Sequence, residues 1–335
     1  MLLKTREDGT TKARMIVDLR RSGGKGYVDL PEMVVLPRLS DLIDGIVDLI
    51  AFDAIAPQET SGYEICFVDF EGAFHTLAIR EEDRGAMAIR TLEGWAIFRR
   101  LCCGMAAAPF VWCRVGAAAA RLGQVCFQPW ELRTQLCADD PAIATRGTPA
   151  ERAWFLGSLL LFWRVLGFTF NWRKAHRGQT VQWIGAQISV EKREGSFGVL
   201  ATFAPKKFQE LRANVDALHK AIGMVKLMLV QHVAGQLSWA SGLFPWIRSF
   251  NVASAKRCPA QLFFVMCIKQ AISWIRLLLA GLVRDPTGKQ LVVQRWTGAV
   301  SRNAMLRVCI RSDSSPFGFG AILFVQGVPR SWLAQ

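Results

Sequence analysis

Two adjacent aspartates, Asp139 and Asp140, are the residues whose type and spacing most directly indicate chemistry. They follow a mostly apolar run at residues 134–138, and another short apolar run follows Pro141. This pattern predicts strand, tight turn and strand, with both carboxylates at the tip of a hairpin. Adjacent carboxylates repel each other, but a divalent cation needs hard oxygen ligands held close together. Because most such pairs are exposed loop residues, a cation site requires a third carboxylate.

A third carboxylate, Asp69, ends a predicted buried strand at residues 63–70. This run is rich in aromatic and β-branched residues, which are typical of strands. An acid at this position is unfavourable unless it is paired or binds a cation. Asp69 and the two hairpin aspartates could therefore form a two-metal phosphoryl-transfer site. One metal would activate an attacking hydroxyl, and the other would hold a triphosphate and its leaving group. Glu71 is interpreted as a surface acid.

Basic and small residues offer further contacts to a phosphate-bearing ligand. Residues 4–21 predict a β-hairpin whose cationic side chains could hold a triphosphate, and a solvated strand face is an equally good interpretation. Lys174, after a short predicted strand and turn, could donate a proton to leaving pyrophosphate, although a solvated lysine is more usual. The small residues around Gly104 permit close approach of a flat group, or simply tight helix packing.

The composition describes a folded protein with a strongly basic charge. The 335 residues, 51% hydrophobic and 20% charged, are enough for two or three domains. The 41 Lys and Arg against 27 Asp and Glu give a net charge of +14, which favours nucleic acid over a merely solubilising surface or acidic lipid. The nine cysteines lack metal-ligand spacing and predict free thiols in a reducing compartment. Without a signal peptide or a membrane span, an intracellular location, cytoplasmic or nuclear, is expected.

Several elements are predicted around the acidic residues. A composition change at residues 191–198 predicts a domain boundary, and residues 181–188 are expected to form a strand or a hairpin arm. Residues 253–295 predict helices without a motif, and a strand at residues 306–310 leads to Asp313 and a Gly-rich turn. The remaining predicted helices, the first capped by Ser40 or Asp41, cover residues 40–50, 117–122, 149–166, 204–222 and 226–241.

The order of these motifs resembles that of reverse transcriptases from LTR- and DIRS-like retrotransposons. Arg14 and residues 18–20 are similar to a strand of the fingers, residues 205–250 to the thumb, and residues 313–320 to the first strand of ribonuclease H. Five further segments resemble, in order, the first catalytic motif, the template- and nucleotide-contacting loop, the Asp-Asp box, the motif after it and the primer grip: residues 69–74, 104–110, 137–140, 167–174 and 183–185.

The resemblance implies an α+β fold of the right-hand polymerase type, with fingers, an antiparallel palm and a helical thumb. Fingers and palm would occupy residues 1–190, and the thumb-like region residues 191–255. A connecting helical region would follow at residues 256–300, and residues 301–335 would be the start of a truncated ribonuclease H-like domain.

The resemblance also implies the reaction and its catalytic residues. Asp69, Asp139 and Asp140 would bind two Mg²⁺ ions, with Mn²⁺ as an alternative. The 3′-hydroxyl of a DNA primer on an RNA template would attack the α-phosphate of a deoxynucleoside triphosphate, giving an RNA/DNA hybrid. Lys174 would be the candidate proton donor. The protein would contribute mainly positioning and charge neutralisation.

Nucleotide-binding residues are implied in the same way. Arg14, with Lys4 or Arg6, would grip the triphosphate, and Gly104 would lie against the nucleotide. Phe74 would be the bulky gate that excludes a 2′-hydroxyl.

The primer would contact a separate hairpin. This primer grip would consist of Trp183, Ile184 and Gly185. Asp313 would be a remnant of the ribonuclease H-like site, and no RNA-cleaving activity is expected from it alone.

Three residues depart from the family pattern. Cys137 stands where an aromatic residue is usual, Cys103 replaces a larger residue, and Pro141 follows the acids although proline cannot donate to a strand ladder. A second hypothesis is therefore a catalytically decayed retroelement remnant that only binds nucleic acid. A basic membrane-surface protein is a third, with little support, because no predicted helix combines a lysine-rich face with a large exposed apolar one.

Overall fold

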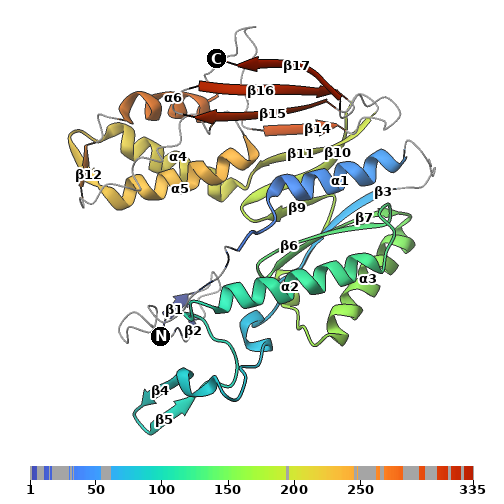
Figure 1. Cartoon of the computed structure of the whole chain (residues 1–335), viewed down its shortest axis with the longest axis vertical. Helices are drawn as coiled ribbons and strands as arrows, with labels where there is room; N and C mark the ends of the chain where they lie inside the picture. Colours follow the sequence, from blue (N-terminus) through green and yellow to red (C-terminus); the bar gives the residue numbers. More distant parts are fainter. Residues whose placement is uncertain are drawn as a thin grey trace.

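The computed structural model describes residues 2–5, 11–14, 16, 30, 32, 34–53, 62–193, 196–244, 247, 262–264, 268–281, 294–298, 308–315, 318–325 and 328–334. These residues form a mixed arrangement of helices and antiparallel sheets (Figure 1). Two four-stranded sheets and six helices make up most of this described part. This agrees with the predicted α+β class.

The first four-stranded sheet carries the acidic residues. Its strand order is β6-β7-β3-β8, and each neighbouring pair is antiparallel. The predicted strand before Asp69 is β3, and the predicted Asp-Asp hairpin is β6 and β7. The four strands are β3 (Gly62–Phe67), β6 (Leu132–Cys137), β7 (Asp140–Gly147) and β8 (His176–Gly178).

Helices cover both faces of this sheet. Ile65 packs in one hydrophobic cluster with residues of α1 (Leu39–Asp53). The next residue, Cys66, packs in another cluster with residues of α2 (Ala108–Val125) and α3 (Pro149–Val165). Since successive strand side chains point to opposite faces, α1 lies on one face and the α2–α3 pair on the other.

The starts of α1 and α3 depend on short-range caps. The α1 helix begins at Leu39, one residue earlier than predicted, and Asp41 acts from inside its first turn by accepting the Arg38 backbone N–H at 2.8 Å. In α3, Thr148 and Glu151 form a reciprocal capping box.

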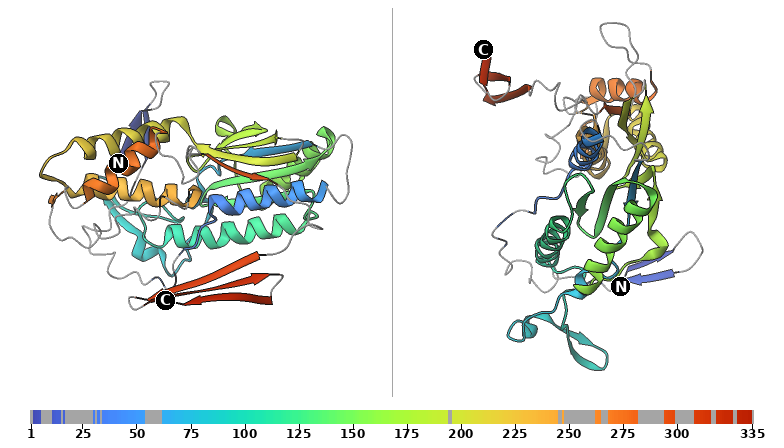
Figure 2. Two further views of the ribbon diagram at one scale, coloured as in Figure 1. Left: turned by 90° about the horizontal axis from the view of Figure 1, so that it is seen from above. Right: turned by 90° about the vertical axis from the view of Figure 1, so that its right-hand side faces the viewer.

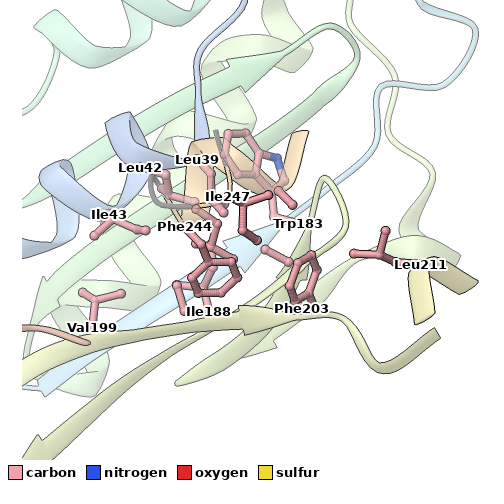
Figure 3. Close-up of a cluster of buried hydrophobic side chains, with 14 of the residues drawn as sticks. Leu39, Leu42, Ile43, Trp183, Ile188, Val199, Phe203, Leu211, Phe244 and Ile247 are labelled. Atoms are coloured by element: carbon pink, nitrogen blue, oxygen red, sulfur yellow. The ribbon is translucent and has the colours of Figure 1, made fainter. Parts of the chain in front are cut away.

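The second four-stranded sheet has the order β14-β11-β10-β9. Its strands β10 and β11 pair with Glu191 opposite Gly198, so the boundary expected at residues 191–198 falls within a hairpin. Val199 and Phe203 of this hairpin share a core with Leu42 of α1 (Figure 3). The strands are β9 (Thr180–Trp183), β10 (Ala186–Arg193), β11 (Ser196–Phe203) and β14 (Gln294–Gly298).

Three helices lie beside this second sheet, at the upper left in Figure 1. They are α4 (Pro205–Lys220), α5 (Leu227–Leu243) and α6 (Lys269–Leu279). In α4, Leu211 and Val215 are buried and form part of its apolar face. The helix predicted over residues 204–222 is shorter in the structure, since Ile222 lies beyond α4 and is exposed.

The region expected to be helical at residues 256–300 also contains strands. Strand β13 (Leu262–Phe264) pairs with β12 (Met224–Lys226), and β14 pairs with β11. The prediction of helices alone was wrong here, because strand pairing between residues distant in sequence leaves no local pattern.

Small antiparallel sheets complete the described part. A three-stranded sheet near the C-terminus stands apart from the other elements in the right-hand view of Figure 2. The strands of the small sheets are β1 (Leu2–Thr5), β2 (Thr11–Arg14), β4 (Ala88–Thr91), β5 (Gly94–Ile97), β15 (Val308–Ser315), β16 (Gly318–Val325) and β17 (Val328–Ala334).

Residues 168–174 were predicted as a short strand followed by a turn; the structure has the turn, but only a single bridge in place of the strand. Phe170 makes one isolated bridge to Phe70, and a single 3₁₀ turn, η4 (Trp172–Lys174), follows. Two further 3₁₀ turns are η2 (Ala73–Thr76) and η3 (Arg84–Met87).

Two global expectations concern membranes and thiols. Within the described part, no helix has both the length and the apolar character needed to cross a bilayer. The cysteines described there are all free thiols, as predicted: Cys66, Cys102, Cys103, Cys113, Cys126 and Cys137.

Candidate active site

The Asp-Asp hairpin has a two-residue turn, Ala138 and Asp139, closed by the pair Cys137 and Asp140. Asp140 is therefore the first residue of β7, and only Asp139 lies in the turn itself. Ala138 has a φ of 56°, and Asp139 does not share this positive sign. This order of signs is that of a type II′ turn, which normally has glycine first. We call residues 138–140 the acid turn.

Asp69 lies beside the acid turn, just beyond the end of β3. Its neighbour Phe70 donates its backbone N–H to the Asp139 carbonyl at 2.9 Å. The Asp69 carbonyl accepts the Asn171 N–H at 2.8 Å, so Asp69 is held between the hairpin and the segment leading to η4. The residue is only 6% exposed.

The neighbouring carboxylates raise the pKa of Asp140. Burial, followed by the charges of Asp139 and Asp69, raises the pKa of Asp140 to about 6 from its ordinary value of 3.8. A side-chain hydrogen bond with Asp69 acts in the same direction. The nearby cation, Lys174, lowers this pKa but does not cancel the rise. The three acids predicted from sequence are thus brought together, close enough for Asp139 and Asp69 to raise the pKa of Asp140.

Lys174 belongs to the same centre. Its Nζ lies 2.6 Å from Asp69 Oδ1, although the lysine side chain is itself 52% exposed. The η4 turn positions it there, after the bridge between Phe170 and Phe70. Lys174 neutralises part of the acidic charge.

The chemistry of these donors fits Mg²⁺. Mg²⁺ prefers carboxylate oxygens and is commonly held by one or two carboxylates together with substrate phosphates. Among the described residues, no three Asp, Glu, His or Cys side chains already surround a common point. Asp69, Asp139 and Asp140 are the carboxylates that could hold Mg²⁺.

Cys137 and Pro141, which depart from the family pattern, both fit into the β6–β7 hairpin. Pro141 lies just before the β3–β7 register, which begins where Ala142 pairs with Phe67. Its missing N–H therefore leaves that register intact, and its carbonyl accepts the Val68 N–H at 3.3 Å. Cys137 is half-buried at the end of β6.

The candidate nucleotide contacts lie on several different segments of the chain. Phe74 is half-buried in η2 and packs against two of the hydrophobic clusters. Gly104, exposed with a φ of 99°, lies in the turn before α2. Arg14 ends β2 and Lys4 lies within β1. Arg6 lies outside the described residues.

The predicted primer-grip hairpin is formed by β9 and β10. Its turn residues Ile184 and Gly185 have φ values of 41° and 92°, the signs of a type I′ turn. We call these two residues the grip turn. Ile184 lines a cavity of ≈ 700 Å³ together with Cys137 and Trp239. Trp183 is buried, and its indole N–H donates to the Asp140 carbonyl at 2.9 Å.

Two contacts were missed by the sequence analysis. The indole N–H of Trp112, on α2, donates to the Ala138 carbonyl at 2.9 Å. Arg100 donates to the carbonyls of His75 and Thr76, at 3.1 and 3.0 Å. A buried tryptophan needs a partner for its N–H, and this was the available signal for Trp112, but it does not identify the acceptor.

Asp313 was predicted to follow the end of a strand. It instead lies inside β15, where it pairs with Gly320. The strand continues to Ser315 because the alternating residues after Ile310 still pair with β16.

Comparison with known proteins shows a likeness to solved structures. No protein-family model and no curated protein matches the sequence. Solved structures of a foamy viral protease–reverse transcriptase match 99% of this chain, at 12–13% identity and TM-scores of 0.52–0.53. They are complexes with double-stranded DNA and with an RNA/DNA hybrid.

The chain has a reverse-transcriptase-like fold. This chain spans 50%, 38% and 60% of the lengths of the three matched chains. The likeness extends over nearly all of this chain and includes its antiparallel sheets and flanking helices. At this level of identity it establishes the fold alone.

Proposed function

We propose that the chain is an RNA-directed DNA polymerase of an LTR- or DIRS-like retroelement. The observation that carries the proposal is the junction of Asp69 with the acid turn. Residues distant in sequence bring three carboxylates together in a partly buried place, where Phe70 N–H binds the Asp139 carbonyl. Outside a cation site this accumulation of like charge is unfavourable. The reverse-transcriptase-like fold supports the same conclusion.

In this proposal the elements have the roles of a right-handed polymerase. The sheet β6-β7-β3-β8 with its helices is the palm, and α4 and α5 belong to the thumb. The hairpins β1–β2 and β4–β5 belong to the fingers. The sheet β15-β16-β17 is the start of a ribonuclease H-like domain in which Asp313 is the remnant acid.

The acidic residues would position the reacting groups. Asp69, Asp139 and Asp140 would hold two Mg²⁺ ions, which supply activation of the primer 3′-hydroxyl and neutralisation of triphosphate charge. The backbone of the acid turn keeps its carboxylates beside Asp69. Lys174, 2.6 Å from Asp69, carries a proton that it can deliver to the leaving pyrophosphate.

Residues outside the acidic centre would select the nucleotide and bind the primer. Phe74 offers a bulky ring that excludes a 2′-hydroxyl, and Gly104 permits close approach of the nucleotide. Arg14, with Lys4 or Arg6, provides positive charge for the triphosphate. Trp183, Ile184 and Gly185 serve the primer end. The net charge of +14 favours the phosphate-rich template and primer.

Primer extension on poly(rA)·oligo(dT) with Mg²⁺ or Mn²⁺ tests the proposal. The wild type is expected to extend the primer, and Asp139→Asn/Asp140→Asn should reduce the rate by roughly 10³-fold or more. Glu71→Gln is the matched control, because Glu71 is exposed and lies close to Asp69 in sequence. It should keep wild-type activity.

Two outcomes would contradict the polymerase assignment. Full activity in the double asparagine variant would remove the acids from the chemistry. A wild type that binds primed template in a salt-sensitive manner but never extends it would establish the binding-only remnant instead.

A further inference from the structure

The backbone of the acid turn is held by donors from three different parts of the chain. Each of its three consecutive carbonyl groups accepts a hydrogen bond, and each donor–acceptor distance is 2.9 Å. One donor is on α2, one follows β3 and one is on β9. The pairs are Trp112 Nε1 to Ala138 O, Phe70 N to Asp139 O, and Trp183 Nε1 to Asp140 O.

The two tryptophan side chains are well suited to fix a backbone. Trp112 and Trp183 are each only 1% exposed. A large buried ring has little freedom to move, and its single N–H needs an acceptor. Trp112 packs edge-on against Phe70 and Phe168. Both indoles therefore act as rigid supports that extend from the core to the turn.

The acid turn needs such support for two reasons. Its carboxylates repel each other and Asp69, which favours opening of the hairpin tip. Ala138 has a φ of 56°, in the region that favours glycine, so the turn residue itself does not stabilise this conformation. Residue 137, where a large aromatic side chain could have packed, is a half-buried cysteine.

We propose that Trp112 and Trp183 are positioning residues that clamp the acid turn from both faces of the sheet, and so set the separation of Asp139 and Asp140 from Asp69. The inference rests on the proposed polymerase function. Trp112 comes from the cluster of α2 and α3, whereas Trp183 belongs to the cluster that contains α1. The two indoles thus connect the acid turn to both hydrophobic cores. In this assignment Trp183 holds the backbone of Asp140 through its indole N–H, and the grip turn that follows it contacts the primer.

Trp112→Phe is the direct test, because phenylalanine keeps an aromatic ring and removes the N–H. Trp163→Phe is the matched control. Trp163 is also buried and contacts Phe70, but its indole N–H donates to the Ala119 carbonyl in α2 at 3.2 Å. Both substitutions remove one buried hydrogen bond and similar volume, and only one of these bonds holds the acid turn.

Two readouts are measured at a temperature where each variant is folded, as checked by circular dichroism. Trp112→Phe should lower the extension rate by about 10–100-fold and weaken Mn²⁺ binding, followed by the electron paramagnetic resonance of free Mn²⁺, by about tenfold. Trp163→Phe should lower the melting temperature similarly but change both readouts by less than roughly threefold.

Trp183→Phe provides a second variant should Trp112→Phe not fold. It should also weaken Mn²⁺ binding and slow extension. Equal losses of rate and Mn²⁺ affinity in Trp112→Phe and Trp163→Phe would overturn the clamp. So would unaltered Mn²⁺ binding in both Trp112→Phe and Trp183→Phe. A wild type without extension contradicts the polymerase proposal separately, since Mn²⁺ binding still reports on the turn.

Discussion

The acid turn and the grip turn each contain a two-residue hairpin loop, but they are stabilised differently. Each loop contains a non-glycine residue with a positive φ, Ala138 or Ile184. All three carbonyls of the acid turn accept hydrogen bonds from other elements. In the grip turn the Gly185 carbonyl accepts the Ala204 N–H at 3.0 Å, while Ile184 lines an open cavity.

This difference suggests a division of work between the two turns. A turn that carries repelling carboxylates must be restrained from outside, because its own sequence opposes the required conformation. A turn that meets a variable ligand needs an accessible surface more than restraint. Trp183 connects the two turns, since it directly precedes the grip turn and its indole N–H donates to the carbonyl of Asp140. Changes at the acid turn should therefore affect chemistry, and changes at the grip turn should affect primer binding.

The largest expected effect is on the chemical step. Asp69→Asn should reduce the extension rate by roughly 10³-fold, because it removes one of the three carboxylates of the proposed metal site. Binding of a primed template should stay within about threefold of wild type, since only the catalytic centre is altered. Single-turnover extension and fluorescence anisotropy measure the two quantities, with Glu71→Gln as control. If Asp69→Asn lowered template binding as much as the extension rate, the acid turn and the grip turn would not have separate roles.

A second prediction concerns the repulsion within the acid turn. Asp140 has its pKa raised to about 6 from 3.8, mainly by burial and then by Asp139 and Asp69. Between these values the folded chain holds a proton that the unfolded chain has released. The free energy of unfolding therefore falls as pH rises through this interval. Asp140→Asn should stabilise the cation-free protein by about 1–3 kcal/mol at neutral pH, and the gain should disappear at or below about pH 4.

Urea unfolding in EDTA at the two pH values measures this effect. Glu71→Gln gives the reference for the loss of an exposed acid. A stabilisation by Asp140→Asn that has the same size at acidic and neutral pH would show that titration of Asp140 is not its cause.

The sequence was informative where structure is local. The end of a buried strand at Asp69 and the hairpin at Asp139 follow from side-chain alternation and turn residues, which need only neighbours in the chain. The positions of β14 and of the isolated bridge at Phe170 could not be predicted in this way. Both depend on pairing with distant strands, and a short apolar run does not specify its partner.

The candidate site shows the same limit. Its acids were found because adjacent carboxylates are chemically unusual, and Lys174 was found as a basic residue of the motif after them. The residues that hold the turn in place were not given that role. Trp112 looks like an ordinary core residue in the sequence, and Trp183 was expected to contact the primer instead. Only the packing of α2 and β9 aims their N–H groups at the turn carbonyls.

The smallest effects are expected from substitutions at the residues with positive φ, which test how much backbone strain each turn tolerates. Gly185 has a φ of 92°, and a Cβ added there would lie 3.3 Å from the Trp239 ring. Gly185→Ala should therefore lower the free energy of unfolding by roughly 1–3 kcal/mol and weaken primer binding severalfold. Gly223→Ala is the matched control, since Gly223 has a φ of 75° and no atom within 4 Å of the added Cβ.

At the acid turn the opposite substitution should be tolerated. Ala138→Gly removes the strain of an alanine in the left-handed conformation, which stabilises the folded state by about 1 kcal/mol. Glycine also gives the unfolded chain more conformational freedom, which lowers stability by a similar amount. Stability should therefore change by less than about 1 kcal/mol. The three external donors still hold the turn, so Mn²⁺ affinity and extension should stay within roughly threefold of wild type. If Ala138→Gly instead weakens Mn²⁺ binding as strongly as Trp112→Phe, the turn is restrained by its own residue, and the indole groups are not sufficient to fix it.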